Sequence, residues 1–481
     1  MIPAAPDARL PDGFAVRLVP TVRHRPDGAL LGGSPLRLMR LAPRAQELLA
    51  DGGVVVRDAT TADLAARLLD AGLAAPELPP RPADDVTVVI PVRDRPAALA
   101  RLLAALRDDP ATAHLPVVVV DDGSVRPVEH GGVVVVRHLR PLGPAAARNA
   151  GLRAVTTPLV AFLDSDCVPQ TDWLRRLRPQ LDDPRLAMVA PRIVALPGAA
   201  HGWPSAYEAV AGALDMGPDP APVRPLSAVS YVPSAALLAR RAALGNGFDE
   251  TMHVAEDVDL GWRLAAAGWR VRYDPAARVA HEHPARTGQW LRRRAFYGTG
   301  AALLATRHGG AVAPVVLAPE SALAWALAVA GGRRGRVAAA GVLAFTSLRL
   351  ARRLRRPGER LPYGFAAALV LRGQGASGRT LARAVTRHHW PIAVAAAAVS
   401  RRARRGVLAV AAADAALAWW PERGRVGPVR YVLARRLDDL AYGGGLWWGA
   451  LRAGDPRALL PARPPRLQSV AHNPGGKRRQ G

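Results

Sequence analysis

The stretch Val86-Thr-Val-Val-Ile-Pro-Val-Arg-Asp94 decides the fold class. It is a run of β-branched and apolar residues that is too short for a helix, and it ends in an acid. Similar runs follow at 117–120, 133–136 and 159–163, with helical patterns between them at 96–106 and 145–154. Strands that alternate with helices are typical of a mostly parallel sheet covered on both faces. The sequence therefore predicts a doubly wound, Rossmann-like α/β domain over residues 83–300.

Acidic residues stand where three of these strands end. Asp94 follows the first strand, Asp121-Asp122-Gly123-Ser124 follows the second, and Asp164-Ser165-Asp166 follows the strand at 159–163. Ligands of an open parallel sheet bind beyond the carboxyl ends of its strands, so these acids are candidate site residues. A single aspartate of this kind would more often cap a turn or helix. Three together favour a site for a nucleotide and a divalent cation, because carboxylates suit such ions and the ion in turn binds a diphosphate.

The ordered set of motifs resembles the inverting nucleotide-sugar glycosyltransferases of family 2, which have the GT-A fold. The resemblance covers residues 84–300, about half of the chain. The motifs are Ile90-Pro91-Val92, Asp121-Asp122-Gly123-Ser124, the segment 143–151 with Arg148 and Asn149, Asp164-Ser165-Asp166, and the segment 255–264 with Glu256-Asp257. Each motif is weak alone, but their common order is specific.

This resemblance implies a role for each matching residue of the donor site. Asp122 would accept a hydrogen bond from uracil, next to a nucleoside pocket that includes Asp121. Arg148 would lie near the ribose and diphosphate, and Asp164 would contact the ribose or the ion. Asp166 would coordinate Mg²⁺ or Mn²⁺, which stabilises the leaving diphosphate. The remaining pocket residues would be Pro91, Val92 and Asp94.

The late acidic pair Glu256-Asp257 is the candidate for the acceptor half of the reaction. In the family the aspartate of this pair is the general base, so Asp257 would remove the proton of the acceptor hydroxyl. Glu256 would contact the acceptor or orient the site. A capping cluster at the start of a helix is the alternative for both. His281 and His283 follow the predicted short strand 271–273, and either could complete the metal site, with His281 slightly favoured.

The N-terminal residues 1–82 read as a separate small α+β module that resembles a winged helix. Two β-rich runs, 14–20 and 29–41, precede two short helices at 42–50 and 61–71, the second capped by Thr61, and a proline-rich linker at 76–82. Such a module could recognise a peptide by adding it as a strand at the sheet edge. It could equally be a packing domain or one that orients the acceptor.

Charge separates the front of the chain from the back. The net charge is +26, but the first 284 residues are nearly neutral at −1 and residues 285–481 carry +27. Residues 301–460 are rich in alanine and arginine with helical pattern, and 461–481 reads as a disordered basic tail. The apolar stretch 311–330 is just long enough to span a bilayer. Three interpretations remain open: a spanning helix, helices that lie on an anionic membrane surface, and a soluble helical cap. Aromatic residues do not interleave with the arginines, which argues against a nucleic-acid partner.

The subgroup that the whole arrangement resembles is the glycosyltransferase of mycofactocin systems in actinobacteria. The resemblance rests on Leu10-Pro11-Asp12-Gly13-Phe14, the leading module, and the apolar basic tail. It implies UDP-glucose as donor and a small peptide-derived redox cofactor, or its precursor, as acceptor. It also fits a place at the cytoplasmic face of the cell membrane, with the cytoplasm as the alternative. The single cysteine, Cys167, excludes an internal disulfide.

Other function classes stay open on the sequence. A rhamnosyl- or galactosyltransferase with a lipid-linked cell-envelope acceptor would suit the basic back half. A nucleotidyltransferase would share the sheet and carboxylates but would not need Glu256-Asp257. A non-catalytic basic membrane-binding protein with a relic GT-A domain is disfavoured, because carboxylates are present at every motif.

Overall fold

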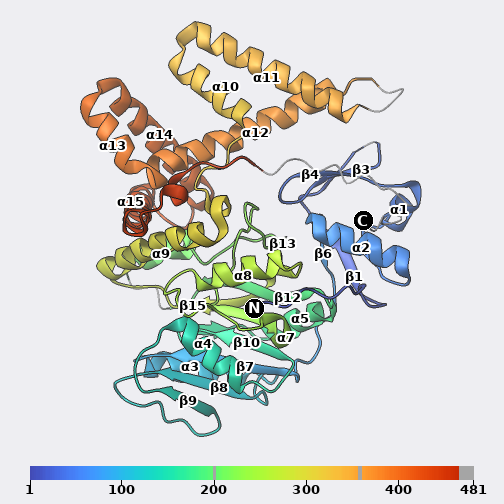
Figure 1. The fold of residues 1–481 in the computed structure, drawn as a ribbon, viewed down its shortest axis with the longest axis vertical. Helices are drawn as coiled ribbons and strands as arrows, with labels where there is room; N and C mark the ends of the chain where they lie inside the picture. Colours follow the sequence, from blue (N-terminus) through green and yellow to red (C-terminus); the bar gives the residue numbers. More distant parts are fainter. Residues whose placement is uncertain (26, 199–201, 356–359, 465–481) are drawn as a thin grey trace. The chain divides into compact units, whose positions relative to one another are not determined.

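The structure, a computed structural model, describes the chain except for residues 26, 199–201, 356–359 and 465–481. It forms two compact units, which are Met1–Ala285 and a helical unit that begins at Arg286. Figure 1 shows both units. The sequence prediction placed the domain limit at residue 300, a position inside helix α9 (Thr287–His308). Most of the tail predicted as disordered lies outside the described residues.

A nine-stranded sheet forms the centre of the first unit and confirms the predicted α/β class. Its order is β11-β15-β12-β14-β10-β7-β8-β9, and β13 pairs with β15. Only β11, β13 and β14 run antiparallel to their neighbours. The strands are β7 (Val86–Val92), β8 (Val117–Asp122), β9 (Val134–His138), β10 (Leu159–Leu163), β11 (Cys167–Pro169), β12 (Leu186–Ala195), β13 (Ala221–Pro222), β14 (Ala236–Arg240) and β15 (Arg270–His281).

Helices cover both faces of this sheet because its strands are apolar on both sides. In β7, Val88 and Ile90 belong to one core and Val89 to the other. The first core takes α3 (Pro96–Asp108) and α5 (Trp173–Leu177), and the second takes α4 (Pro144–Ala154), α7 (Arg241–Leu244) and α8 (Glu256–Ala266). The turn η1 (Arg178–Asp182) and helix α6 (Trp203–Ala211) complete the domain.

The strand β15 is much longer than the predicted short strand 271–273. It pairs with β12 from Arg270 to His281, but the register jumps between Asp274 and Arg278. The residues between them bulge out of the ladder. The sequence did not reveal this strand as one element, because Asp274-Pro275 reads as a turn.

The N-terminal module has its own core and two three-stranded sheets. Helix α2 begins after Asp58, whose Oδ1 accepts a hydrogen bond from Thr61 N–H at 2.8 Å. Thr61 was predicted as the cap but is the reciprocal partner, donating to and accepting from Asp58. The predicted run 29–41 is a hairpin of two strands. The elements are β1 (Ala15–Leu18), β2 (Arg23–His24), β3 (Ala29–Gly32), β4 (Arg37–Arg40), α1 (Pro43–Leu48), β5 (Gly53–Val55), α2 (Ala59–Ala71) and β6 (Ala74–Pro76).

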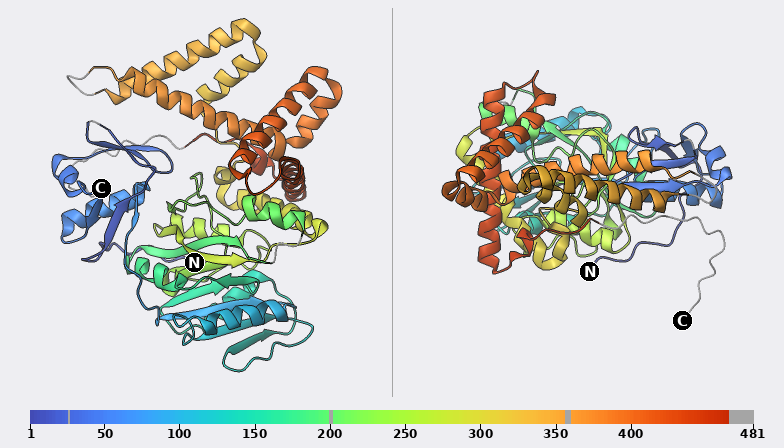
Figure 2. Two further views of the ribbon diagram at one scale, coloured as in Figure 1. Left: turned by 180° about the vertical axis from the view of Figure 1, so that it is seen from behind. Right: turned by 90° about the horizontal axis from the view of Figure 1, so that it is seen from above.

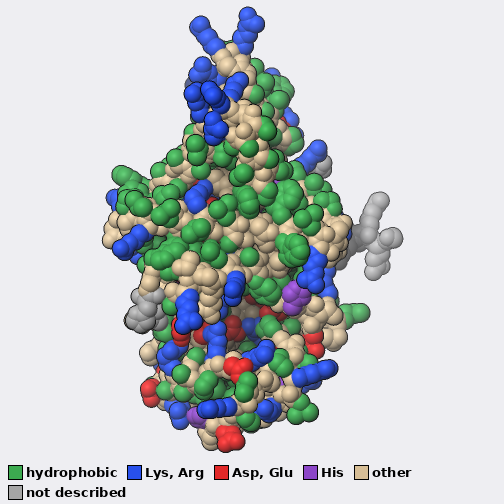
Figure 3. All heavy atoms as spheres, turned by 90° about the vertical axis from the view of Figure 1, so that its left-hand side faces the viewer, with side chains coloured by type: hydrophobic (Ala, Val, Ile, Leu, Met, Phe, Trp, Pro, Cys, Tyr) green, Lys and Arg blue, Asp and Glu red, His purple; other side chains and the backbone are tan. Residues whose placement is uncertain are grey.

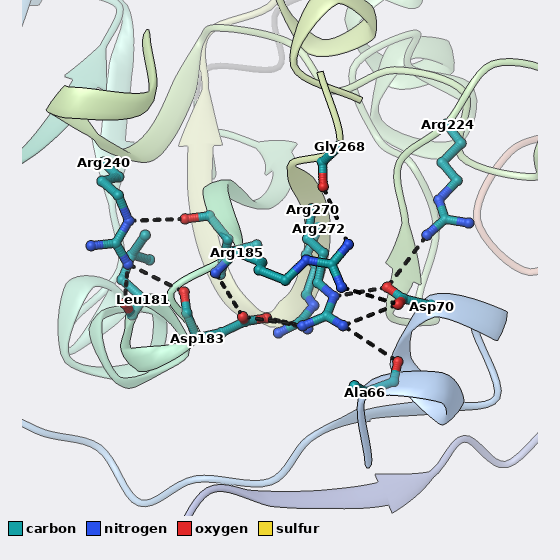
Figure 4. Close-up of polar contacts among 11 residues, drawn as sticks. Ala66, Asp70, Leu181, Asp183, Arg185, Arg224, Arg240, Gly268, Arg270 and Arg272 are labelled. Atoms are coloured by element: carbon teal, nitrogen blue, oxygen red, sulfur yellow. Dashed lines mark hydrogen bonds and ion pairs between the residues drawn. The ribbon is translucent and has the colours of Figure 1, made fainter. Parts of the chain in front are cut away.

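Buried ion pairs attach this module to the sheet (Figure 4). Asp70 of α2 accepts from Arg270 Nε at 2.8 Å, and Arg270 Nη1 also reaches Asp183 at 3.0 Å. Arg272 Nη2 donates to the same Asp183 oxygen at 2.9 Å. Asp183 is fully buried, and among the described residues its carboxylate accepts hydrogen bonds from these two arginines and from the backbone N–H of Arg185.

The second unit is a set of antiparallel helices (Figures 1 and 2). The most extensive helix–helix packing in this unit is between α9 and α15 (Pro428–Ala453). Gly298, Gly445 and Gly449 let these two backbones approach closely. The remaining α-helices are α10 (Pro319–Ala330), α11 (Gly332–Leu354), α12 (Tyr363–Arg383), α13 (Trp390–Val399) and α14 (Arg401–Trp419). Short 3-10 helices are η2 (Gly309–Val312), η4 (Trp420–Glu422) and η5 (Pro456–Leu459), and η3 (Ala384–His388) is a π-helix.

The stretch 311–330 is not one helix. Its first residues, up to Val312, belong to η2, and the residues that follow are irregular. Helix α10 begins only at Pro319. Among the described residues, no helix combines the length and the apolar character that crossing a membrane requires.

Candidate functional site

The loops after β7 and β8 hold each other at the carboxyl edge of the sheet. Asp94 N–H donates to Ser124 Oγ at 3.0 Å, and Val125 N–H donates to Asp94 Oδ1 at 2.8 Å. Asp94 has a positive φ of 53°, which a short side chain that bonds the neighbouring loop can tolerate. Pro91 is partly exposed beside this loop, whereas Val92 is buried in the core.

Asp121 lies inside this edge and not on its surface. It is 0% exposed and accepts hydrogen bonds from Ser124 N–H, Val128 N–H and Arg137 Nη1 at 2.9 to 3.1 Å. Burial opposes its ionisation, but the hydrogen bonds from Ser124 and Val128 and the charge of Arg137 outweigh it and lower its pKa. These contacts let Asp121 hold the loop that carries Ser124 and Val128, and its predicted place in the nucleoside pocket stays a prediction.

Asp122 organises the start of helix α4. Its two oxygens accept from Leu142 N–H and Gly143 N–H at 2.9 Å, and His138 Nδ1 lies 2.8 Å away. Gly143 precedes the first turn of α4, so Asp122 fixes where this helix begins. The side chain is 9% exposed at the carboxyl edge, next to the Asp94 loop.

Arg148 of α4 joins two of the predicted motifs. Its Nη2 donates to Asp164 at 2.6 Å and its Nη1 to Glu256 at 2.9 Å, and its guanidinium lies 5.5 Å from the Phe248 ring. The side chain is 4% exposed, but the two carboxylates raise its pKa despite burial. Neighbouring Asn149 bonds the backbone of Phe248 in both directions, which secures this loop. Residues 148, 164 and 256 thus form one charged cluster.

Glu256 and Asp257 form the first turn of α8. Burial, followed by the charge of Asp257, raises the pKa of Glu256 to about 7. Asp257 accepts from Ser234 N–H at 3.0 Å and Val258 N–H at 2.8 Å. Burial also raises the pKa of Asp257 against these hydrogen bonds. Two adjacent carboxyls with raised pKa values at the edge of a sheet are suited to proton transfer near neutral pH.

Asp166 and His281 meet at the end of β15. Their side chains approach to 3.4 Å between Oδ1 and Nε2, and Arg95 pairs with the other Asp166 oxygen. His281 is 4% exposed, and its Nδ1 has no hydrogen-bond partner among the described residues. One carboxylate and one imidazole are a donor pair that fits Mn²⁺ or Mg²⁺ when a ligand supplies the remaining oxygens. The described residues contain no group of three such side chains, and Asp164 is engaged by Arg148.

His283 lies beside His281 but pairs with a different carboxylate. Its Nδ1 lies 3.8 Å from Glu208 of α6, and its ring centre is 5.5 Å from that of His281. Glu282, between the two histidines, pairs with Arg101 of α3. The preference for His281 as the metal ligand stays a prediction, and its contact with Asp166 supports it.

Sequence reasoning missed several residues of this site. Arg95 and Ser234 carry no motif, and Glu208 belongs to a helix that the sequence did not predict. Arg95 could have been found, because it directly follows Asp94 at a strand end. Ser234 and Glu208 could not, because only the fold brings them to Asp257 and His283.

Comparisons with known proteins agree with this geometry. The family model "Glycosyl transferase family 2" matches residues 87–244. The chain is 48% identical over 471 residues to "Pre-mycofactocin glycosyltransferase" of Mycobacterium tuberculosis, covering 94% of this chain and 98% of the relative. An N-acetylglucosaminyl-diphospho-decaprenol L-rhamnosyltransferase of the same species is 40% identical over 87 residues, which is 17% of this chain and 28% of the relative. A solved mannosyltransferase of Pyrobaculum calidifontis with GDP-Man and Mn²⁺ is 20% identical, covers 76% of this chain and 90% of its own, and has a TM-score of 0.37.

The chain therefore belongs to glycosyl transferase family 2, and it is a glycosyltransferase with the GT-A fold. Within this family, its likeness to the pre-mycofactocin enzyme extends over nearly the whole of both chains, which confirms the resemblance inferred from the motifs and the leading module.

Proposed function

We propose that the protein transfers a hexose, glucose from UDP-glucose, to the peptide-derived precursor of mycofactocin with inversion at the anomeric carbon. The observation that carries the chemistry is the charged cluster in which Arg148 joins Asp164 to Glu256, with Asp257 beside it. The acceptor is supported by the 48% identity to the pre-mycofactocin enzyme along nearly the whole chain.

The donor would lie along the carboxyl edge, with its nucleoside between the Asp94 and Asp122 loops. Two backbone N–H groups hold the Asp122 carboxylate in one orientation. Its remaining lone pairs therefore have a fixed direction and would accept a hydrogen bond from the uracil N–H. Asp164, held by Arg148, would face the ribose. Arg148 itself would add positive charge near the diphosphate without moving, because both of its partners are in place before the donor arrives.

Asp257 would act as general base and Glu256 as its neighbour that orients the acceptor. The acceptor oxygen forms the new bond to the anomeric carbon while the bond from that carbon to the diphosphate oxygen breaks. The hydroxyl proton passes to Asp257, and UDP leaves with the bonding electron pair. The Ser234 and Val258 N–H groups hold Asp257 in one orientation, which keeps its remaining lone pairs available for that proton.

Asp166 and His281 would hold a Mg²⁺ or Mn²⁺ ion together with oxygens of the diphosphate. When bound, the ion supplies positive charge that stabilises the leaving group. Arg95, which pairs with Asp166 here, would turn its charge towards the same phosphates.

The test is an assay of the purified chain with the peptide-derived acceptor and a panel of UDP-glucose, UDP-galactose and dTDP-rhamnose. With UDP-glucose as donor, mass spectrometry should find one or more hexoses added to the acceptor. NMR should show that the new linkage is β. Transfer of rhamnose or galactose to a decaprenyl-linked sugar instead would support the cell-envelope alternative. If no sugar is transferred to either acceptor, the catalytic proposal is wrong, and the result supports the alternative of a non-catalytic membrane-binding protein.

We also propose that the helical unit lies on an anionic membrane surface. Most large hydrophobic side chains that the described residues expose belong to this unit, among them Val337, Phe345 and Leu371. In Figure 3 the upper part of the view shows hydrophobic side chains with arginines among them, while Asp and Glu are seen in the lower part. Four exposed arginines also begin α14, where positive charge opposes the helix dipole and an anionic surface would offset that cost: Arg401, Arg402, Arg404 and Arg405.

A further inference from the structure

The sheet holds Asp166 and His281 beside each other. Cys167 of β11 pairs with His281 of β15 in the antiparallel ladder, and Glu282 N–H donates to the backbone carbonyl of Asp166 at 3.0 Å. The two side chains approach to 3.4 Å between Asp166 Oδ1 and His281 Nε2, and they are 10% and 5% exposed. Strand pairing therefore fixes both donors of the proposed ion site.

Two protein donors leave most of the coordination of an ion to other groups. Mg²⁺ and Mn²⁺ prefer octahedral coordination, chiefly by oxygen. Among the residues that the structure describes, no three His, Cys, Asp or Glu side chains lie together in a way that could hold a metal ion. The diphosphate of a nucleotide sugar would supply some of the remaining oxygens, so the ion and the diphosphate would bind to each other as well as to the protein.

Arginines balance the carboxylates around this donor pair. Three ion pairs each join one carboxylate to one arginine: Asp166 to Arg95, Asp164 to Arg148, and Glu282 to Arg101. A carboxylate with an arginine beside it attracts a further cation less strongly than an unpaired carboxylate does, because the two positive charges repel. An ion alone would therefore meet little net negative charge here, whereas a diphosphate brings negative charge of its own.

Arg95 contacts Asp166 itself. Its guanidinium lies on Oδ2 of Asp166, while Oδ1 of the same carboxylate faces His281. The Arg95 side chain is 40% exposed, so it can leave Asp166 without giving up much buried surface. The residue precedes the first turn of α3 and directly follows Asp94, whose loop lies at the carboxyl edge of the sheet. Its charge is thus placed to repel an ion at Asp166 or to pair with phosphate oxygens bound there.

Given the ion site proposed above, we infer that Arg95 makes ion binding depend on the diphosphate of the donor. Arg95 opposes a Mg²⁺ or Mn²⁺ ion alone at Asp166 and His281. It favours the ion together with a diphosphate, because its charge then pairs with the phosphate oxygens. Coupling between two ligands is reciprocal, so the ion should raise the affinity for UDP by the same factor by which UDP raises the affinity for the ion.

The first test measures the binding of Mn²⁺ alone to the full chain, by the loss of the electron paramagnetic resonance signal of free Mn²⁺. Arg95→Gln should bind Mn²⁺ roughly 10-fold or more tightly than the parent, because the opposing charge is gone while Asp166 and His281 remain. A tenfold change is about 1.4 kcal/mol. Equal Mn²⁺ affinity of the parent and Arg95→Gln would overturn the inference.

The second test measures the dissociation constant of UDP by isothermal titration, once in EDTA and once in saturating Mn²⁺. The ratio of the two constants is the coupling between ion and diphosphate, and it should be roughly 10-fold or more smaller in Arg95→Gln than in the parent. Loss of a phosphate contact alone would weaken UDP binding in both conditions and leave the ratio unchanged, which would overturn the inference. A ratio of one in the parent would instead contradict the proposed ion site itself.

Two further variants separate the contact of Arg95 from charge in general. Arg101→Gln removes the same charge from α3 but breaks the exposed pair with Glu282, so its Mn²⁺ affinity should stay within about threefold of the parent. Arg95→Lys keeps a cation beside Asp166, so its coupling ratio should stay within about threefold of the parent. An effect of Arg101→Gln as large as that of Arg95→Gln would overturn the assignment to Arg95. Arg95→Lys that behaves like Arg95→Gln would overturn the role of the charge.

Discussion

At the residue scale, Asp257 carries the most specific prediction. Asp257→Asn should lower kcat by roughly 10² to 10⁴, because a positioned base is lost, while UDP binding stays within about twofold of the parent. Single-turnover transfer and equilibrium UDP titration measure the two quantities. The control is Asp108→Asn, an exposed acid at the end of α3, which should change neither. A variant that keeps full turnover would remove Asp257 from the base role, and loss of UDP binding would move it to the donor site.

Glu256 makes stability depend on pH in a defined direction. Its folded pKa of about 7 is above the ordinary value of 4.5, so its stabilising contribution is complete below pH 4.5 and is lost as the pH rises through 7. Between pH 5 and 8 the parent should lose up to roughly 3 kcal/mol of unfolding free energy relative to Glu256→Gln, at about 1.4 kcal/mol per pKa unit.

Urea unfolding of both proteins at the two pH values measures this difference. Glu129→Gln, an exposed glutamate in the loop after β8, is the control and should follow the parent. Identical pH profiles of the parent and Glu256→Gln would show that the carboxyl of Glu256 ionises normally.

The ion site predicts different outcomes for the two histidines. His281→Ala should raise the Mn²⁺ concentration needed for half-maximal activity at least 10-fold, since it removes a donor next to Asp166. Asp166→Ala should abolish activity together with the metal requirement. His283→Ala should leave the Mn²⁺ dependence unchanged, because His283 faces Glu208. Activity of the parent that persists in EDTA would contradict the whole metal proposal.

At the element scale, Asp183 holds together η1, β15 and α2 through Arg270 and Arg272. Asp183→Ala should lower the unfolding free energy by roughly 3 to 5 kcal/mol, because two buried guanidinium groups lose their shared partner. Urea unfolding gives the value. The control is Glu47→Ala, which breaks the exposed pair with Arg44 and should cost at most about 1 kcal/mol. Equal small losses in both variants would mean that water compensates the arginines.

At the scale of the whole molecule, the division of charge predicts how the chain meets a membrane. The full chain should sediment with anionic phosphatidylserine vesicles but not with neutral ones. The four-arginine variant, in which Arg401, Arg402, Arg404 and Arg405 become Gln, should bind at least 10-fold more weakly, since each arginine near such a surface contributes about 1 kcal/mol. The same four positions changed to Lys keep the charge and should bind like the parent. Parent protein that stays in the supernatant with both kinds of vesicle would refute the surface proposal.

The buried arginines of the helical unit limit how far total charge predicts this behaviour. Arg387 contacts Asp438 at 2.8 Å and Asp439 at 3.1 Å, and Arg383 contacts Asp439 at 2.9 Å. These side chains stabilise α15 against α12 and η3 and are not available to a membrane. The sequence showed the excess of arginine, but only packing separates the internal arginines from the exposed ones.

The sequence alone determined the doubly wound domain, the order of the five motifs and the division of charge. These features are local: a strand, its terminal acid and a run of arginines each lie within a few residues, so the pattern reports them directly. For the same reason it pointed to Asp121, Asp122, Asp166 and Asp257 as candidate site residues but could not tell that the side chain of Asp121 is fully buried.

Only the tertiary structure decided what those residues do together. Arg148 meets Glu256 although 108 positions separate them, and Arg270 meets Asp70 across 200. Burial and pairing over such distances depend on how the sheet and helices pack, and no local pattern encodes them. That packing raises the pKa of Glu256, and it places His281 beside Asp166 and His283 beside Glu208. It also breaks the stretch 311–330, because each of these outcomes is set by neighbours that the fold brings from elsewhere in the chain.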